Sequence, residues 1–237
     1  MGRGEVRGYN QSMSAFTRKS QYRKTILKDF KVNLLAGKWQ KDQAQLVLES
    51  LALLRDGLDR ITGGRGREWI RSNLGGVSLS IGSDKTIWGN RLIMDRFFAG
   101  RSHVTGNRVY MAGDFHRNPW RVPGKAGDLW IIHELGHVWD DRSANGLGTL
   151  LGGGHGDALM RHVGARSKAF LGLRFVDQSL VIDPINAFGN QGYFAYGNNS
   201  PADYFAHAFA VTIAFPGNPN IPPGVESWMI DLINRTI

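Results

Sequence analysis

The sequence predicts an α+β domain that carries a small mixed sheet and is preceded by a helical layer. Leucines recur at near-helical spacing through Trp39–Ile61, which is typical of a helix with one buried face. Val77–Ile81 and Arg108–Ala112 alternate apolar and polar residues, as half-buried strands do. Ser200–Phe215 is apolar almost throughout and is followed by Pro216, which predicts a core helix. With 237 residues and 42% hydrophobic composition, the chain can bury one sizeable core.

The first 72 residues are expected to form a basic helical region that packs on a domain of residues 73–237. Ser14–Leu35 has a weakly helical and strongly basic pattern, and Gly37 interrupts it. The helix predicted at Trp39–Ile61 ends at the glycine pair that begins at Gly63, because glycine readily adopts the backbone conformation that terminates helices. Arg67–Asn73 predicts a further short helix. The leucine stripe is interpreted as core packing and nothing more.

The middle and the end of the chain give a coarser pattern. Leu92–Phe98, between the two predicted strands, is compatible with a helix or a strand, and both stay open. Asp114–Lys125 contains two prolines and is expected to be a loop. Gly146–Gly156 predicts a glycine-rich loop, Asp157–Phe170 a helix, and Gly224–Ile233 a final amphipathic helix.

The clearest sign of chemistry is a pair of histidines, His133 and His137, in the segment Asp128–Arg142. Asp128 can cap the start of a helix there. Residues four apart share one face of a helix, so both imidazoles can face one metal ion. Glu134 then lies beside that face, where a general base stands in an H-E-x-x-H site. The alternative is two histidines on a solvated helix face, and a third ligand decides between them.

Two acidic residues, Asp140 and Asp141, fall near the expected C-terminal end of this helix. The helix dipole disfavours negative charge at that end. Either both carboxylates are solvated and merely tolerated, or one of them orients a ligand histidine. The sequence leaves both interpretations open.

A catalytic zinc site needs three protein ligands, and the predicted core helix Ser200–Phe215 offers two candidates. Asp203 and His207 are four residues apart and therefore lie on one face. Polar side chains in so apolar a helix need a partner, which a metal site would provide. His155 and His162, by contrast, are interpreted as surface or packing histidines.

These two motifs together resemble a known family. H-E-L-G-H, which begins at His133, and P-A-D-Y-F-A-H-A-F-A, which begins at Pro201, are similar to the gluzincin metallopeptidases. They are most similar to the anthrax lethal factor-like group, in which H-E-x-x-H is followed by a helix of the form P-x-E-[DF]-F-A-E-A-F. The run H-E-L-G-H-V-W-D-D also resembles the H-E-x-x-H-x-x-D-D of neprilysin-like gluzincins. The resemblance covers about Gly106–Phe215 and leaves the first hundred residues unmatched.

The resemblance implies a zincin-like domain with His133, His137 and Asp203 as metal ligands, where Asp203 takes the place of the family's glutamate. His207 takes the place of a second carboxylate that supports the site. It is also a rival third ligand, which would give a site of three histidines. Tyr196 matches a tyrosine that helps to stabilise the tetrahedral intermediate. Aspartate is one methylene shorter than glutamate, so the second helix has to approach the metal more closely.

The function implied is zinc-dependent hydrolysis of peptide bonds. Zn2+ lowers the pKa of a bound water, and Glu134 would accept its proton and deliver it to the leaving amine. A protein or peptide substrate would add as an extended strand to a sheet edge, a role that the resemblance gives to Arg108–Ala112. The alternative is a non-catalytic zincin-fold protein that binds through its basic N-terminal surface. A metal-dependent hydrolase of another bond would use the same residues.

Positive charge is concentrated in the N-terminal third of the chain. The net charge is +9 in total, while residues 1–72 contain 15 Lys and Arg against 7 Asp and Glu, and the rest contains 14 against 13. Such a bias fits an anionic membrane, an acidic partner, nucleic acid or merely a solvated face. No nucleic-acid binding is expected, because the aromatic residues that single strands stack on are sparse there.

Composition and termini say little about compartment. The chain has no cysteine, which excludes disulfides and cysteine ligands but fits exported and internal proteins alike. We expect no signal peptide and no transmembrane segment, because the N-terminus is polar and the most apolar stretch is short. By analogy with the delivered effectors of the lethal factor-like group, the chain would be a bacterial toxin module. It would be secreted or injected by a route that it does not encode, with a secretion or immunity partner.

Overall fold

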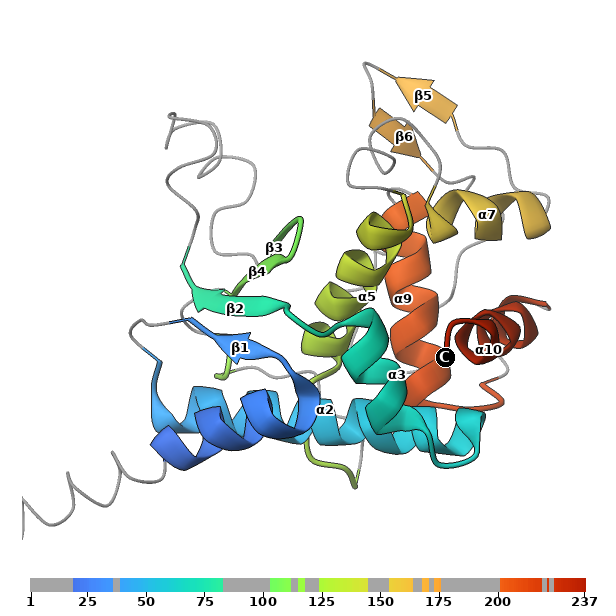
Figure 1. Ribbon diagram of the computed structural model, residues 1–237. Helices are drawn as coiled ribbons and strands as arrows, with labels where there is room; N and C mark the ends of the chain where they lie inside the picture. The colour runs from blue at the N-terminus through green and yellow to red at the C-terminus, as the bar shows by residue number, and fades with distance from the viewer. Residues whose placement is uncertain are drawn as a thin grey trace, which may run out of the picture.

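The computed structural model describes residues 19–35, 39–82, 103–111, 115–117, 124–144, 154–163, 168–170, 173–175, 201–218, 221 and 224–237. It confirms the α+β class (Figure 1). The helices are residues 19–30, α2 Lys41–Thr62, α3 Gly66–Asn73, α5 Leu129–Ser143, α7 His155–His162, α9 Pro201–Ala214 and α10 Val225–Arg235. The strands are β1 Asn33–Leu34, β2 Ser78–Ile81, β3 His103–Thr105, β4 Arg108–Met111, β5 Lys168–Phe170 and β6 Leu173–Phe175.

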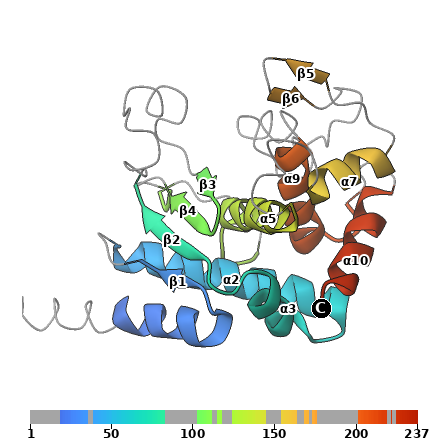
Figure 2. The ribbon, with the colours of Figure 1, turned by 45° about the horizontal axis from the view of Figure 1, so that its top comes forward.

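Within the described residues, the main sheet has four strands in the order β1-β2-β4-β3. β1, β2 and β4 run parallel, while β3 runs antiparallel to β4. α2 passes beneath the sheet and continues under α5 and α9, as both ribbon views show (Figures 1 and 2). The sheet is therefore mixed, as the sequence predicts, and it stands beside the helix that carries the two histidines.

The edge role expected for Arg108–Ala112 is wrong. Arg108–Met111 forms β4, which pairs with β2 on one side and with β3 on the other. The edge next to α5 is β3 in the part of the chain that the structure describes. The chain reverses between β3 and β4 in a two-residue turn, where Gly106 takes a left-handed backbone (φ 54°) that glycine adopts without strain. This hairpin places one more strand outside the expected one.

The helix of the basic N-terminal segment ends before Leu35, its expected last residue. The described helix covers residues 19–30, and β1 follows. Lys31 has a left-handed backbone (φ 58°), and its amide donates to the carbonyl of Leu27, so it ends the helix as a C-terminal cap does. Asn33 then donates to the carbonyl of Val77. Because the strand is held by this distant pairing, the local pattern could not reveal it.

The helix expected at Asp157–Phe170 is also wrong in its extent. α7 begins earlier, at His155, and ends at His162. The last residues of the expected helix form β5, in which Ala169 pairs with Arg174 of β6. A hairpin partner decides this strand, and short apolar runs do not distinguish strand from helix by periodicity alone.

The remaining predicted elements lie within two residues of their expected bounds where the structure describes them. One hydrophobic cluster joins them and crosses residue 72: it includes Leu51 and Trp69 from the N-terminal region, Leu135 of α5 and Phe209 of α9. The region before residue 73 thus supplies a strand and part of the core to the same unit. Within the described ranges, no helix is both long and apolar enough to cross a membrane.

Candidate metal centre

The start of α5 is fixed by two hydrogen bonds. Asp128 is the N-cap, as predicted, and its carboxylate accepts from the amide of Trp130 at 2.9 Å. The amide of Asp128 itself donates to the hydroxyl of Ser50 at 2.8 Å. Because Ser50 belongs to α2, the long N-terminal helix sets where the histidine-bearing helix begins.

α5 and α9 pack most closely where Gly136 of α5, which has no side chain, faces Ala206 of α9. A Cβ atom on Gly136 would lie 2.9 Å from the Cα atom of Ala206 and 3.2 Å from its Cβ atom. Such a distance is below van der Waals contact, so any larger residue at this position forces the helices apart. The close approach brings the polar face of α9 against the histidines of α5.

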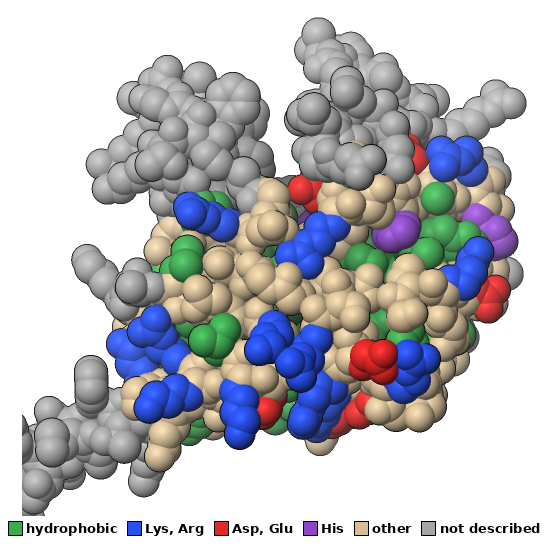
Figure 3. All heavy atoms as spheres, in the orientation of Figure 1, with side chains coloured by type: hydrophobic (Ala, Val, Ile, Leu, Met, Phe, Trp, Pro, Cys, Tyr) green, Lys and Arg blue, Asp and Glu red, His purple; other side chains and the backbone are tan. Residues whose placement is uncertain are grey.

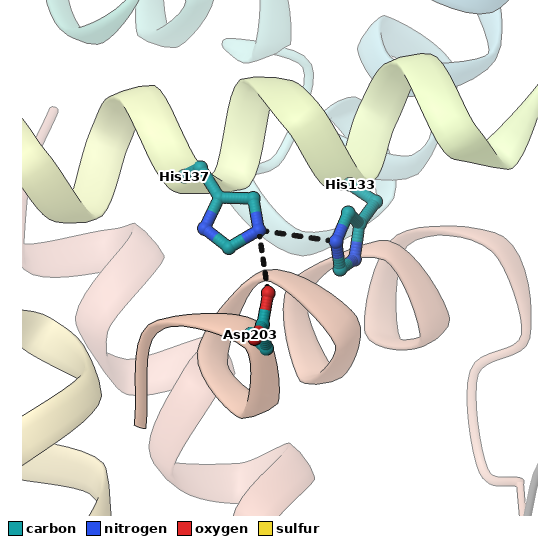
Figure 4. A group of neighbouring side chains, drawn as sticks. All are labelled: His133, His137 and Asp203. Atoms are coloured by element: carbon teal, nitrogen blue, oxygen red, sulfur yellow. Dashed lines mark hydrogen bonds and ion pairs between the residues drawn. The ribbon is translucent and has the colours of Figure 1, made fainter. Parts of the chain in front are cut away.

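Three side chains meet at this crossing (Figure 4). The Nε2 atom of His137 lies 3.1 Å from the Nε2 atom of His133 and 3.2 Å from a carboxylate oxygen of Asp203. One possible ligand atom from each of the three residues lies within 4.8 Å of the other two. The structure thus brings together His133, His137 and Asp203, the first ligand set that the sequence offers.

The two histidines have opposite pKa shifts. Burial, together with the nearby His137 and His207, lowers the pKa of His133 well below its usual value. Burial also acts to lower the pKa of His137, but the hydrogen bond and the charge of Asp203 outweigh it and raise this pKa to about 9. Without a bound cation, His137 therefore carries a proton that it shares with Asp203, while His133 is neutral.

Glu134 is buried next to this cluster, with 3% of its surface exposed. Burial raises the pKa of Glu134 to about 7. The proximity of His137 opposes this shift, and the charges of Asp203 and Asp128 add to it. A carboxylate with such a pKa can exchange a proton near neutral pH.

Two aromatic rings flank His133. His207 packs on it edge to face, with ring centroids 5.5 Å apart, and burial lowers the pKa of His207 to about 3. The indole of Trp130 stacks on the His133 ring, with an interplanar angle of 17° and ring centroids 5.1 Å apart. Trp130 lies three residues before His133, which places both on one helix face.

Asp140 has a role that neither sequence interpretation foresaw. It is buried, and its carboxylate accepts from the amide of Gly156 at 2.8 Å. Ser143 likewise accepts from the amide of His155 at 3.0 Å. The end of α5 thus caps the start of α7. Burial raises the pKa of Asp140 to about 6, against the effect of the Gly156 amide.

His155, His162 and Tyr196 are the other residues that the sequence singled out. His155 packs against Trp139, with ring centroids 5.0 Å apart, and His162 lies beside Trp228 at 6.2 Å. His155 is half-buried and His162 is exposed, so one is a packing and the other a surface histidine, in line with the interpretation from the sequence. Tyr196 lies outside the described residues, so its assigned role stays a prediction.

The donor set fits a first-row divalent cation. Two imidazoles and one carboxylate are ligands that Zn2+ accepts, and three protein ligands leave a position open for chemistry. The buried neutral His133 is already in the protonation state that a ligand needs. No protein-family model, curated protein or solved structure matches the chain, so the argument for function rests on this geometry.

Proposed function

We propose that the chain is a zinc-dependent metallopeptidase with a zincin-like fold, and that His133, His137 and Asp203 hold the zinc ion. The observation that carries this proposal is the convergence of these three side chains within 4.8 Å, beside a buried glutamate that directly follows the first histidine. A purely structural metal site has no use for that glutamate. The family resemblance supports the same set of residues.

The proposed hydrolysis would depend on the zinc ion, Glu134 and Tyr196. Bound zinc would act as a Lewis acid that lowers the pKa of water and polarises the scissile carbonyl. Glu134, whose pKa is about 7, accepts a proton from the attacking water and then donates it to the leaving amine. Tyr196 is the candidate that the resemblance offers for stabilising the oxyanion. Protons balance, because the one taken from water leaves with the amine.

Substrate binding involves the sheet edge. β3 is the described strand that lies at the edge nearest α5, so it replaces Arg108–Ala112 as the expected docking strand. An extended peptide that pairs with β3 would be recognised mainly through its backbone. The toxin role and an immunity partner remain proposals by analogy, and they rest on the resemblance alone.

The test compares metal content and turnover. Glu134→Gln should keep stoichiometric zinc and lose peptide hydrolysis by about two to four orders of magnitude, which is the usual contribution of a general base. Glu68→Gln makes the same substitution on the surface of α3 and should change neither quantity. Full activity in Glu134→Gln would refute the mechanism. Zinc binding without turnover of any peptide by the unmodified protein would instead favour the non-catalytic binding protein.

A further inference from the structure

The helix of residues 19–30 presents an outward face that no part of the described core covers. Lys24, Leu27 and Lys28 are spaced at i, i+3 and i+4 and are exposed, so they share one face of the helix, and the exposed Lys31 follows directly after it. We call these four residues the stripe. Ile26, on the inward side, is fully buried. The solvent side of the helix therefore presents a leucine surrounded by lysines, while its inward side is apolar.

The stripe continues onto α3. The carbonyl of Lys31 accepts from the amide of Gly76, directly after the turn that ends α3. Arg67 and Arg71 are exposed on α3, one turn apart. We call the surface made by Lys24, Leu27, Lys28, Lys31, Arg67 and Arg71 the basic face.

Charge on this side of the molecule is strongly one-signed. Residues 19–31 and 65–71 contain eight Lys and Arg against two acidic residues, Asp29 and Glu68. Glu68 is paired with Arg65 at 2.9 Å. Among the described residues, no ion pair engages the three lysines of the stripe. Figure 3 shows Lys and Arg side chains spread across this side, over helix 19–30 and α3, with few acidic ones among them.

Leu27 distinguishes the basic face from an ordinary solvated surface. It is 49% exposed and is the one large hydrophobic side chain classed as exposed in the described part of the chain. The backbone of Lys31 is a second unusual feature of this surface. It is left-handed, a conformation that glycine or asparagine usually takes at a helix end. The basic face thus contains both an exposed leucine and a lysine with a strained backbone.

We propose that the basic face docks onto anionic lipid headgroups, with Leu27 entering the apolar boundary of the bilayer. Basic residues around an apolar side chain are the composition of helices that lie on membrane surfaces. Single-stranded nucleic acid fits less well, since Tyr22 is half-buried and bonded to Gln45 and offers no open ring for stacking. An acidic protein partner fits less well too, because one leucine makes too small an apolar centre for an interface.

The proposal goes beyond the peptidase function and does not depend on it, so metal-free protein suffices for the test. Vesicles of phosphatidylcholine, alone or mixed with phosphatidylserine, are sedimented with the protein at low and at physiological salt. Binding is expected only to the phosphatidylserine vesicles and should weaken as salt screens the charges. The combined variant Lys24→Gln, Lys28→Gln, Lys31→Gln should bind about a hundredfold more weakly, given the usual contribution of each basic residue near a membrane.

Two controls make the result specific to this face. Leu27→Ser should weaken vesicle binding by roughly fivefold, as loss of a partly inserted leucine predicts. The variant Arg117→Gln, Arg161→Gln, Arg235→Gln removes the same charge from exposed residues elsewhere and should bind nearly as well as the unmodified protein. Thermal unfolding of every variant verifies that it is folded.

Three results would overturn the proposal. The first is no binding to phosphatidylserine vesicles, including the case in which a nucleic acid or an acidic protein binds the lysine stripe instead. The second is an equal loss in the arginine control, which would make net charge alone responsible. The third is unchanged binding by Leu27→Ser, because the assignment to a membrane rests on that side chain.

Discussion

Asp203 and His207 are the two candidates for the third metal ligand. Asp203 has an oxygen 3.2 Å from the Nε2 atom of His137, whereas His207 contacts His133 through the edge of its ring. The geometry therefore favours Asp203, although the carboxylate is short. His207 instead packs edge to face with the His133 ring, on which Trp130 also stacks.

Metal analysis of two alanine variants tests this choice. Asp203→Ala is expected to lose bound zinc, because it removes a ligand, while His207→Ala should keep zinc and lose roughly 1–3 kcal/mol of stability from the cavity it leaves. Zinc content is measured by atomic absorption on proteins purified without chelators. The reverse pattern, with zinc kept in Asp203→Ala and lost in His207→Ala, would establish the three-histidine site.

Protonation of His137 predicts how metal affinity depends on pH. Its pKa of about 9 beside Asp203 means that a cation has to displace a proton at neutral pH. Affinity should therefore rise with pH up to about 9, with close to one proton released per zinc at neutral pH. The metal-free fold has the opposite dependence: the raised pKa gives stability that is complete below the unfolded value, near 6.5, and is lost as pH rises through about 9.

Calorimetry in two buffers of different ionisation enthalpy measures this proton release. The dependence of the observed heat on the buffer gives the number of protons directly. His162→Ala serves as the control, since that histidine packs beside Trp228, and it should release the same number. Zinc binding with no proton release would show that His137 is not a ligand.

For the helices, the decisive feature is the contact between Gly136 and Ala206. It lets α9 approach α5 closely enough for the short side chain of Asp203 to reach the histidines. A Cβ atom at Gly136 would lie 2.9 Å from the backbone of Ala206, so Gly136→Ala has to move one helix. We expect this variant to bind zinc at least tenfold more weakly and to be roughly 1–3 kcal/mol less stable, the usual cost of overpacking.

A compensating substitution tests whether helix spacing limits zinc binding. Adding Asp203→Glu to Gly136→Ala lengthens the ligand by one methylene and should restore zinc binding without restoring stability. Gly57→Ala is the matched control, because its Cβ atom would lie 2.6 Å from Ile213 of the same helix α9. It should lose stability but keep zinc. If Asp203→Glu fails to restore binding, the spacing argument is incorrect.

Across the whole molecule, the candidate site joins the two helices at the centre of the core. α5 and α9 both contribute fully buried residues such as Leu135 and Phe209 to one hydrophobic cluster. An ion held by both helices binds the folded state alone, so it stabilises the fold according to its concentration relative to the dissociation constant. Stability and metal loading should therefore change together.

Thermal unfolding tests this coupling. Free zinc at about a hundred times its dissociation constant should raise the unfolding temperature by roughly 5–10 °C for a chain of this size, and chelation should reverse the rise. His133→Ala should show no zinc-dependent shift, whereas the exposed residue His162 can be replaced by alanine with the shift retained. An equal shift in His133→Ala would place the stabilising ion elsewhere.

Local patterns predicted most of the helices and the residues that meet at the candidate site. The i, i+4 spacing placed His133 and His137 on one face, and the cap at Asp128 follows from its position before an apolar run. The same spacing singled out Asp203 and His207 in the second helix. These features depend on neighbours within one or two turns, which the sequence displays directly.

Only the tertiary structure decided which distant segments meet. β1 exists because Asn33 pairs with β2, the edge of the described sheet is β3 because of the turn at Gly106, and Asp140 of α5 caps α7. The closeness of α5 and α9 at Gly136 likewise belongs to the packed molecule. Such contacts join residues far apart in the chain, and hydrogen bonding and packing between them leave no periodic trace in the sequence.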